Sequence, residues 1–595
     1  MPEPMSNQHR YAVWAPTVDS MAVVVGADGD QRHEMTRLDS GWWEVEADQG
    51  DGRYAFSING NDPRPDPRSL SQPDGVHAAS ELVDLSSFEW TDDGWEGVEM
   101  PDAVVYEMHI GTFTPEGTFD AAIVHLDYLR DLGVTVLEIL PVAAFPGKAG
   151  WGYDGVNLYA VYAQYGGAEA FARFINAAHE RGLAVWLDVV YNHFGPSGNY
   201  LKEYGPYFTQ AYHTPWGEAV NLDGFASDGV RAFILDNVAM WLGDFHLDGL
   251  RLDAVHELHD RRAVHILEEM AALADEITEE TDIPRNLIAE SDRNDPATVA
   301  PRGTGGVGGF GLHGQWVDDV HHALHVHLTG ETQGYYSDFA DPEALEKVLG
   351  QTPFFHDGTY SSFRVGTHGT KIDPSVTPGY RFVASLQTHD QIGNRAVGDR
   401  LAHLTSDGMA AIGAALLLTS PYTPMLFMGE EWAASTKWQY FTDHAEEWLA
   451  DAIREGRAAE FAEHGWSDDV PDPQDESTVE ASTLNWDEVT APAHARMHDW
   501  YQTLLRLRRE VPALRDTPLG ESRVEHNREL RTIIVQRGNV TVVANRDEDE
   551  QVIKLPGDTD GQEVLAAWGS ATINRSSAPA TITLGGHDVA VIGGV

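Results

Sequence analysis

The sequence has no cysteine and only six lysines, and these shortages limit what the protein can be. Without cysteine there can be no disulfide, no thiolate metal site and no thiol nucleophile. The chain also lacks any run of 18 or more apolar residues, and its first residues, MPEPMSNQHRYAVWAP, do not combine a basic start with an apolar stretch. These absences predict a soluble, intracellular protein that stays in the cytoplasm.

Basic residues are scarce beside acidic ones. The 94 Asp and Glu outnumber the 39 Lys and Arg, which gives a formal net charge of −55 over 595 residues. Such a surface repels nucleic acids and anionic membranes, so we expect neither as a partner, whereas a neutral ligand such as a sugar is compatible with it. The acidic excess favours a halophilic adaptation to concentrated salt, with a merely acidic protein as the alternative. The oligomeric state stays open.

The pattern of apolar residues divides the chain into three parts. Residues 1–98 contain short aromatic and β-branched runs separated by Gly, Asp and Pro, which predicts a β-sandwich of carbohydrate-binding or immunoglobulin-like type. Residues 99–515 alternate strand and helix patterns, as parallel β/α units do. Residues 516–595 return to strand alternation and predict a second β-sandwich.

The middle part contains eight strand patterns, which predict a (β/α)8 TIM barrel of the α/β class. They lie at 103–113, 134–142, 183–193, 246–255, 286–291, 313–319, 381–390 and 424–431. A segment at about 435–490 interrupts the pattern before the last helix, and we predict loop and short helix there. In a TIM barrel the carboxyl ends of the strands build the active site, so polar residues at those ends are candidate catalytic groups.

The stretch FHLDGLRLDAVHELH, residues 245–259, ends the fourth predicted strand with two charges. Side chains alternate faces along a strand, so Arg251 and Asp253 point the same way. One interpretation is a surface ion pair of little energetic value. The other is a catalytic group, and the remaining strand ends bear on that choice.

Polar side chains also stand at the ends of three other predicted strands. The set is Asn192 and His193 after the third strand, Arg251 and Asp253 at the fourth, Glu290 at the fifth, and His389 and Asp390 at the seventh. Retaining glycoside hydrolysis needs a carboxylate nucleophile and a carboxylic acid about 5 to 5.5 Å apart, and adjacent strand ends can provide both.

Environment suggests a role for each group. Arg251 should keep Asp253 ionised as the nucleophile, and a raised pKa should leave Glu290 protonated as the acid. Asp390 remains to stabilise positive charge on the sugar ring. The imidazoles of His193 and His389 could donate hydrogen bonds to ring hydroxyls.

Four segments carry a resemblance to a known family. DVVYNH (188–193), GLRLDAVH (249–256), LIAES (287–291) and LQTHDQ (386–391) resemble the four ordered motifs of the α-amylase superfamily, glycoside hydrolase family 13. The resemblance implies that Asp253 is the nucleophile, Glu290 the general acid/base and Asp390 the transition-state stabiliser. It also implies sugar contacts, and these come from Arg251, His193 and His389.

The segment WGYDG (151–155) fits the same superfamily. It offers the Tyr153 ring for a sugar to stack on and the Asp154 carboxylate as a hydrogen-bond acceptor, although Tyr153 as simple packing at the barrel rim is the alternative. Trp216, His256 and Gln391 complete the substrate-binding set that we predict.

Nearly the whole chain is similar to the malto-oligosyltrehalose trehalohydrolase family within that superfamily. The similar segments are YEMHIGTFTPEGTF (106–119), MGEEWAASTKWQYFTDH (428–444) and REGRAAEFAEHGW with VPDPQ (454–474). The resemblance implies cleavage of the α-1,4 bond next to a terminal trehalose unit, with release of trehalose. One departure from the family is Lys437, where Pro usually stands, and we expect it to affect the local loop and not the chemistry.

Two other functions stay open at this point. A glycogen branching enzyme would share the sandwich, the barrel and the three carboxylates, although the QIGN that follows Asp390 differs from the acidic, Val-rich continuation usual there. A glucan-binding protein with an inactive barrel is the second alternative, and the intact Asp253, Glu290 and Asp390 argue against it.

We expect no cofactor and no metal. Calcium needs six to eight oxygen ligands, and residues 194–245 show no run of spaced carboxylates that would supply them. The His-rich HHALHVH at 321–327 could suggest zinc, but we predict a helix there, after the sixth strand.

Overall fold

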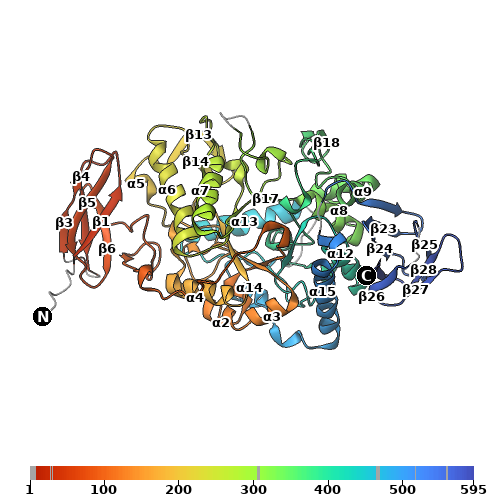
Figure 1. Ribbon diagram of the computed structural model, residues 1–595. Helices are drawn as coiled ribbons and strands as arrows, with labels where there is room; N and C mark the ends of the chain where they lie inside the picture. The colour runs from red at the N-terminus through yellow and green to blue at the C-terminus, as the bar shows by residue number, and fades with distance from the viewer. Residues whose placement is uncertain are drawn as a thin grey trace.

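The three parts of the chain lie in a row, with the barrel between two groups of antiparallel sheets (Figure 1). The computed structural model describes residues 8–594 except 27, 28, 30, 304–307, 464–469, 516, 517 and 558–560. The described N-terminal strands form one end of the molecule and the last strands form the other.

Two antiparallel sheets form the N-terminal part. One contains β1 (Gln8–Trp14), β5 (Trp42–Asp48) and β4 (Thr36–Arg37), and the other contains β3 (Gln31–Glu34), β2 (Met21–Val25), β6 (Arg53–Ile58) and β7 (Ser80–Glu81). Tyr11, Val23 and Phe56 are buried in the same core, as expected where strands of two sheets turn apolar side chains inward.

Eight parallel strands close into the predicted barrel. In chain order they are β8 (Val105–Met108), β9 (Val136–Ile139), β12 (Ala184–Val189), β15 (Gly249–Leu252), β16 (Asn286–Ala289), β17 (Gly314–Trp316), β20 (Phe382–Ser385) and β21 (Thr423–Phe427). The barrel closes where β21 pairs with β8, with Met425 opposite Val105. Each strand matches one predicted segment but is shorter: the end of the first segment forms α1, and the polar ends at Asn192, Asp253, Glu290 and Asp390 leave the sheet.

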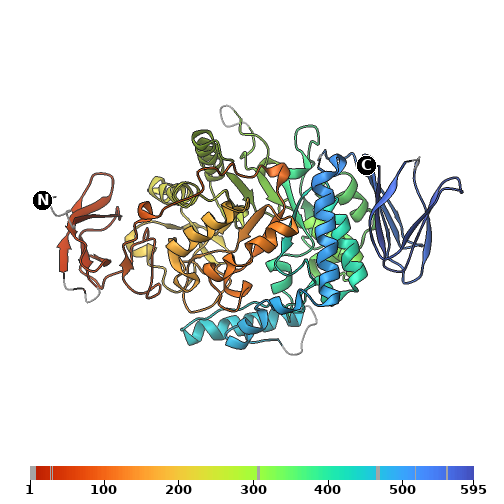
Figure 2. The same cartoon turned by 60° about the horizontal axis from the view of Figure 1, so that its bottom comes forward.

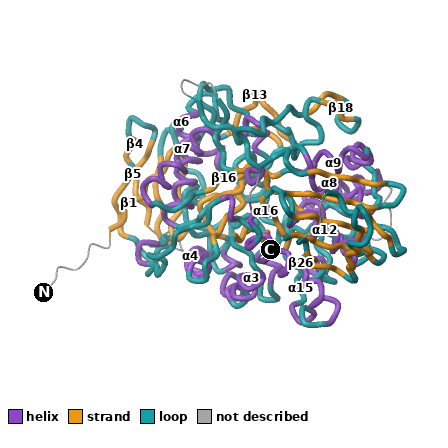
Figure 3. The backbone as a smooth tube through the Cα atoms, turned by 45° about the vertical axis from the view of Figure 1, so that its right-hand side comes forward, coloured by secondary structure: helices purple, strands orange, loops and turns teal. Residues whose placement is uncertain are grey.

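Helices surround the barrel strands (Figure 3). The longer ones are α4 (Gly167–His179), α6 (Ser227–Ala239), α7 (Ile266–Thr281), α8 (Asp318–Thr329), α9 (Pro342–Gly350), α12 (Asp407–Leu418), α13 (Glu447–Glu463) and α15 (Pro492–Glu510). Shorter ones are α1 (Ile110–Phe113), α2 (Phe119–Ile123), α3 (Leu126–Leu132), α5 (Leu201–Tyr204), α10 (His389–Gly393), α11 (Leu401–Leu404), α14 (Glu476–Ser482) and α16 (Pro512–Arg515). Three antiparallel strand pairs lie outside the barrel sheet: β10 (Ala143–Ala144) with β11 (Asn157–Val161), β13 (Phe208–Thr214) with β14 (Gly217–Val220), and β18 (Thr359–Ser361) with β19 (Gly366–His368).

The interior of the barrel is apolar at one end and polar at the other. Val105, Val136, Trp186, Trp316 and other buried apolar residues fill the end where the strands begin. A side chain at Gly249 would place its Cβ 2.7 Å from the Trp186 ring, so glycine there makes room for the indole. Two residues further along each strand the inward positions become polar: Glu107, Glu138, Asp188 and Arg251, all buried. This polar layer lies directly beneath the carboxyl ends of the strands.

The predicted loop and short helix at 435–490 is wrong in part. This segment contains α13, a 17-residue helix, as well as the short α14. Figure 2 shows α13 in cyan along the lower edge of the molecule. Its sequence, EWLADAIREGRAAEFAE, is rich in Ala, Glu and Arg, which favour helix even without a regular apolar stripe. The helical pattern at 119–133 also divides, into α2 and α3, at the exposed Val124.

The C-terminal strands form the predicted second pair of sheets. The five-stranded sheet contains β22 (Arg523–Asn527), β23 (Thr532–Arg537), β24 (Val540–Asn545), β29 (Val589–Gly593) and β26 (Glu563–Trp568). The three-stranded sheet contains β25 (Gln551–Lys554), β28 (Thr581–Leu584) and β27 (Ala571–Asn574). Ile534, Val543 and Ile582 are buried between them. Over the described residues, we find no helix with the length and apolar character needed to span a bilayer.

Candidate active site

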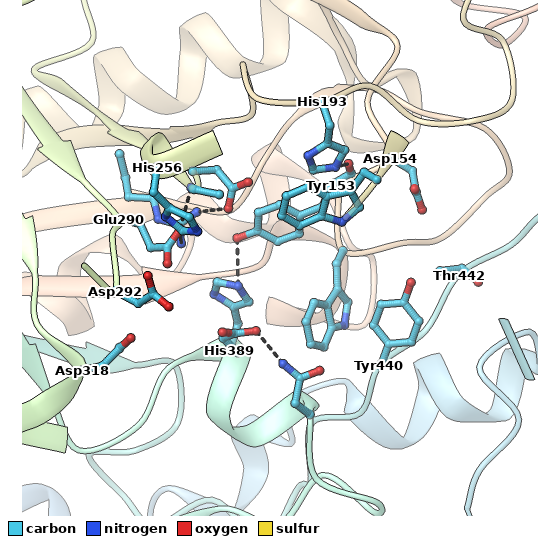
Figure 4. A pocket seen from close by; sticks show the side chains of 17 residues that line it. Tyr153, Asp154, His193, His256, Glu290, Asp292, Asp318, His389, Tyr440 and Thr442 are labelled. Carbon is cyan, nitrogen blue, oxygen red and sulfur yellow. Dashed lines mark hydrogen bonds and ion pairs between the residues drawn. The ribbon is translucent and has the colours of Figure 1, made fainter. Parts of the chain in front are cut away.

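A cavity of about 530 Å³ opens at the carboxyl ends of the barrel strands (Figure 4). The residues that line it are Trp151, Tyr153, Asp154, His193, Trp216, Arg251, Asp253, Ala254, His256, Glu290, Asp292, Asp318, His389, Asp390, Asn394, Tyr440 and Thr442. The three predicted catalytic carboxyl groups are therefore in one cavity, together with every predicted substrate-binding residue except Gln391.

Arg251 holds the carboxylates of two neighbouring strand ends. Its Nη1 lies 2.9 Å from Oδ1 of Asp253 and 2.8 Å from Oδ2 of Asp188, the residue beside it in the register of β12 and β15. The guanidinium also lies 4.3 Å from the centre of the Trp316 ring. The Arg251 side chain is 3% exposed, so the interpretation of Arg251 and Asp253 as a surface ion pair is wrong.

Asp253 has a second donor, which fixes the direction of its carboxylate. Asn192, after β12, donates from Nδ2 to Oδ2 of Asp253 at 2.7 Å and to its backbone oxygen at 2.8 Å. The Asp253 side chain is still 12% exposed toward the cavity. One oxygen is therefore held by Arg251 and the other by Asn192, while the carboxylate faces the space where a ligand would bind.

Glu290 follows β16 and lies next to Asp253. Its Oε2 accepts a hydrogen bond from the backbone N–H of Ala254 at 2.6 Å and lies 3.9 Å from Nη2 of Arg251. Burial raises the pKa of Glu290 to about 8; Arg251 opposes this rise, while Asp253 and Asp318 add to it. This is the direction that the sequence predicts, and it leaves the carboxyl group protonated at neutral pH.

His389 is fixed by the polar layer beneath it. Its Nδ1 lies 2.5 Å from Oε1 of Glu107, and its backbone N–H donates to the other oxygen of Glu107 at 3.0 Å. Its Nε2 lies 2.9 Å from the Tyr153 hydroxyl, which donates to Asp188. Burial opposes a charge on the imidazole, but the Glu107 carboxylate outweighs it, so the pKa of His389 is raised. The Tyr153 ring stacks on His389 and lines the cavity, so Tyr153 both packs at the rim and faces the ligand space.

His193 and Trp216 form a second aromatic wall. Their rings are stacked, with centres 4.3 Å apart, and Nε2 of His193 is 3.0 Å from the backbone oxygen of Tyr153. Burial lowers the pKa of His193, which favours the neutral imidazole. Trp216, at the turn between β13 and β14, is 51% exposed although it is a large aromatic residue. Asp154 lies nearby, 3.5 Å from Nε2 of His444.

Asp390 and Gln391 lie in the first turn of α10, but their side chains make different contacts. Asp390 lines the cavity, where Asn394 donates to its Oδ1 at 2.6 Å. The predicted contact from Gln391 needs correction, because its side-chain oxygen accepts from the N–H and hydroxyl of Thr388 at 2.8 and 2.6 Å. Gln391 therefore caps the helix and does not line the cavity.

Sequence reasoning missed six other polar or aromatic residues that line the cavity: Trp151, Asp292, Asp318, Asn394, Tyr440 and Thr442. It also missed Glu107 and Asp188, whose carboxylates bind His389 and Arg251 from the polar layer of the barrel. Alternation gave a signal for Asp292, two residues after Glu290, and Asp318 follows the sixth predicted strand. Tyr440 and Thr442 lie in the insertion, within the 428–444 segment that resembles the family, but no spacing or strand end there marked them as cavity residues.

Two further sequence expectations concern side chains outside the cavity. Lys437, where the family usually has Pro, pairs with Asp399 at 2.9 Å and does not line the cavity. The His-rich stretch 321–327 lies on α8, as predicted, and Nδ1 of His321 is 2.7 Å from the backbone oxygen of Leu386. Within the described ranges, no three His, Asp or Glu side chains gather in a way that could hold a metal ion.

Comparisons with known proteins agree with this architecture. Residues 2–73 match the family model of carbohydrate-binding module 48 (isoamylase N-terminal domain), and residues 71–216 match that of the alpha amylase catalytic domain. The malto-oligosyltrehalose trehalohydrolase of Rhizobium sp. (strain M-11) is 50% identical over 93% of this chain and 94% of its own length. A 1,4-alpha-glucan branching enzyme of Xanthomonas campestris is 30% identical over only 41% of this chain and 37% of its own. A crystal structure of an alpha-amylase-like protein from Salmonella typhimurium superposes with a TM-score of 0.87 and 38% identity, and covers 99% of both chains.

Proposed function

Because this chain belongs to the malto-oligosyltrehalose trehalohydrolase family, we propose that it hydrolyses the α-1,4 bond next to the terminal trehalose of a malto-oligosyltrehalose and releases trehalose. The observation that carries the proposal is the meeting of Asp253, Glu290 and Asp390 in one cavity at the carboxyl ends of the barrel strands. The acidic surface suits a neutral oligosaccharide, and the N-terminal match to a carbohydrate-binding module suits a glucan chain.

The first chemical step joins the sugar to Asp253. An oxygen of the Asp253 carboxylate forms a bond to the anomeric carbon, while the bond from that carbon to the oxygen of the trehalose unit breaks. Glu290 gives its proton to the departing oxygen. Support comes from the geometry, since Arg251 and Asn192 hold Asp253 toward the cavity and burial keeps Glu290 protonated.

The second step returns the free glucan chain. Glu290, now a carboxylate, takes a proton from water, the water oxygen bonds to the anomeric carbon, and the ester to Asp253 breaks. Two displacements at the same carbon retain the α configuration. Asp390 and His389 have the complementary task of stabilising the charged ring and its hydroxyls, and Tyr153 and Trp216 offer rings for the sugars to stack on.

We propose the same three domains that the sequence predicts, at 1–98, 99–515 and 516–595, with catalysis in the middle one. The cytoplasmic location and the lack of nucleic-acid partners stay predictions from the sequence, as does the absence of a cofactor or metal.

The alternative is a branching enzyme, which would transfer the glucan chain to another glucan instead of to water. Product analysis separates the two functions. The purified protein should liberate trehalose and a shorter maltodextrin from malto-oligosyltrehalose. If it instead forms α-1,6 branches in amylose and liberates no trehalose, the branching interpretation replaces this one. Binding without any turnover would support an inactive, glucan-binding barrel.

A further inference from the structure

Asp318 lines the cavity and adds to the raised pKa of Glu290, but the proposed chemistry gives it no contact with the substrate. It is the first residue of α8 and follows the sixth barrel strand, so it occupies the same level of the barrel as the catalytic carboxyl groups. Figure 4 shows it on one side of the cavity with Glu290 and Asp292, while Tyr440 and Thr442 lie on the other side.

Four of the other five carboxyl groups of the cavity accept a hydrogen bond from the protein: Asp253 from Arg251 and Asn192, Glu290 from the N–H of Ala254, Asp390 from Asn394, and Asp292 from Arg364 at 2.7 Å. The fifth, Asp154, lies 3.5 Å from Nε2 of His444. In contrast, the described residues provide no hydrogen-bond donor to the Asp318 side chain. Its neighbour Asp319 accepts from Asn294 and from the backbone N–H of Phe355 and His356, so the start of α8 is anchored without Asp318.

A carboxyl group without a donor is costly in a partly buried place, which makes Asp318 a candidate for a donor that arrives with a ligand. Its charged surroundings are mainly acidic: Asp390, Asp292 and Asp319, with Arg251 as the nearby cation. Burial, followed by these carboxylates, raises the pKa of Asp318 to about 7, so near neutral pH its carboxyl group can both accept and donate a hydrogen bond. A sugar hydroxyl offers both kinds of partner.

The position of Asp318 indicates which sugar it meets. Glu290 must face the oxygen that leaves, so the leaving sugars lie on the side of Glu290, away from the Tyr153 ring that receives the sugar to be attacked. Asp318 and Asp292 are on that side of the cavity. We propose that Asp318 is a substrate-binding residue whose carboxyl group hydrogen-bonds a hydroxyl of the trehalose unit on the leaving side of the scissile bond.

This inference rests on the proposed function, and a binding experiment can separate the two. The background variant is Glu290→Gln, which lacks the acid and therefore binds malto-oligosyltrehalose without cleaving it. This protein is titrated with malto-oligosyltrehalose and, separately, with each of the two products, trehalose and maltodextrin. Adding Asp318→Ala should raise the Kd for malto-oligosyltrehalose and for trehalose roughly 10- to 100-fold, the range typical for a hydrogen bond to a charged group. The Kd for maltodextrin should stay within twofold.

Two further variants make the result specific. Glu343→Gln removes one negative charge from the exposed face of α9 and should change none of the three Kd values. Asp318→Asn keeps the shape of the side chain and should also weaken trehalose binding. If Asp318→Asn and Asp318→Ala both weaken it, the loss comes from the carboxyl group and not from a folding defect in one variant.

Two outcomes would overturn the inference. One is an unchanged Kd for trehalose in a folded Asp318→Asn or Asp318→Ala protein. The other is a loss confined to maltodextrin, which would move Asp318 to the attacked side of the bond. If Glu290→Gln binds neither malto-oligosyltrehalose nor trehalose while Asp318 is intact, the proposed function itself fails, and that is a different result.

Discussion

Replacing Glu290 by Gln should remove the proton donor of the reaction and make the folded protein more stable at neutral and alkaline pH. The pKa of Glu290 rises from 4.5 to about 8 on folding, so the folded protein keeps a proton that the unfolded chain releases. The unfolded state binds fewer protons throughout this interval, so the contribution of Glu290 to stability is fully present below pH 4.5 and falls as pH rises toward 8. The loss amounts to about 3 kcal/mol at pH 7 and to about 5 kcal/mol above pH 8, because one pKa unit corresponds to 1.36 kcal/mol.

The test compares urea unfolding of the wild type and of Glu290→Gln at pH 5, 7 and 9. Gln is neutral at every pH, so the difference in free energy of unfolding between the two proteins should grow in favour of the variant between pH 5 and 9. Other titrating groups are common to both proteins and cancel in the difference. A difference that stays constant with pH would refute the claim that Glu290 is a neutral acid in the folded protein, and its role as the proton donor would lose its physical basis.

Three other perturbations have definite expected results. Asp253→Ala should lower kcat by more than the roughly 10²- to 10⁴-fold typical of losing a general acid or base. The melting temperature should change little, because Arg251 still has its ion pair with Asp188. Substantial residual turnover would contradict the nucleophile role. Raising KCl from 0.1 to 3 M should raise the melting temperature, because the Debye length falls from about 10 Å at 0.1 M to about 3 Å at 1 M and the net charge of −55 is screened; a flat or falling trend would mean that the acidity is not a salt adaptation. Glu138→Gln should leave kcat and its pH profile unchanged, because burial and then the nearby Glu107 raise the pKa of Glu138 and keep it neutral; a shifted profile would show that the carboxyl group is ionised in the native protein.

The barrel and most of its site could be predicted from the sequence because local patterns determine them. Eight strands of alternating or continuous apolar residues mark the barrel, and its geometry then brings the ends of strands four, five and seven together. Strand ends and the family resemblance together singled out Asp253, Glu290 and Asp390, and all three line one cavity; their catalytic roles stay a prediction.

The parts that could not be predicted depend on contacts between distant segments. Tyr440 and Thr442 reach the cavity from the insertion at 435–490, and no local pattern shows which of its side chains turn toward the barrel. The task of Gln391 depends on a capping bond to Thr388, which competes with a contact to the ligand. Glu107 lies in the middle of the first predicted strand, and only its approach to His389 across the barrel interior gives it a place in the site.

The measurement that tests the central claim most directly is proton NMR of the purified protein acting on malto-oligosyltrehalose, recorded before the new reducing ends mutarotate. Retaining hydrolysis through Asp253 and Glu290 predicts that trehalose signals rise together with the α anomer of the shortened maltodextrin. Trehalose accompanied by the β anomer as first product would contradict the double displacement, and new α-1,6 signals without trehalose would contradict the hydrolysis itself.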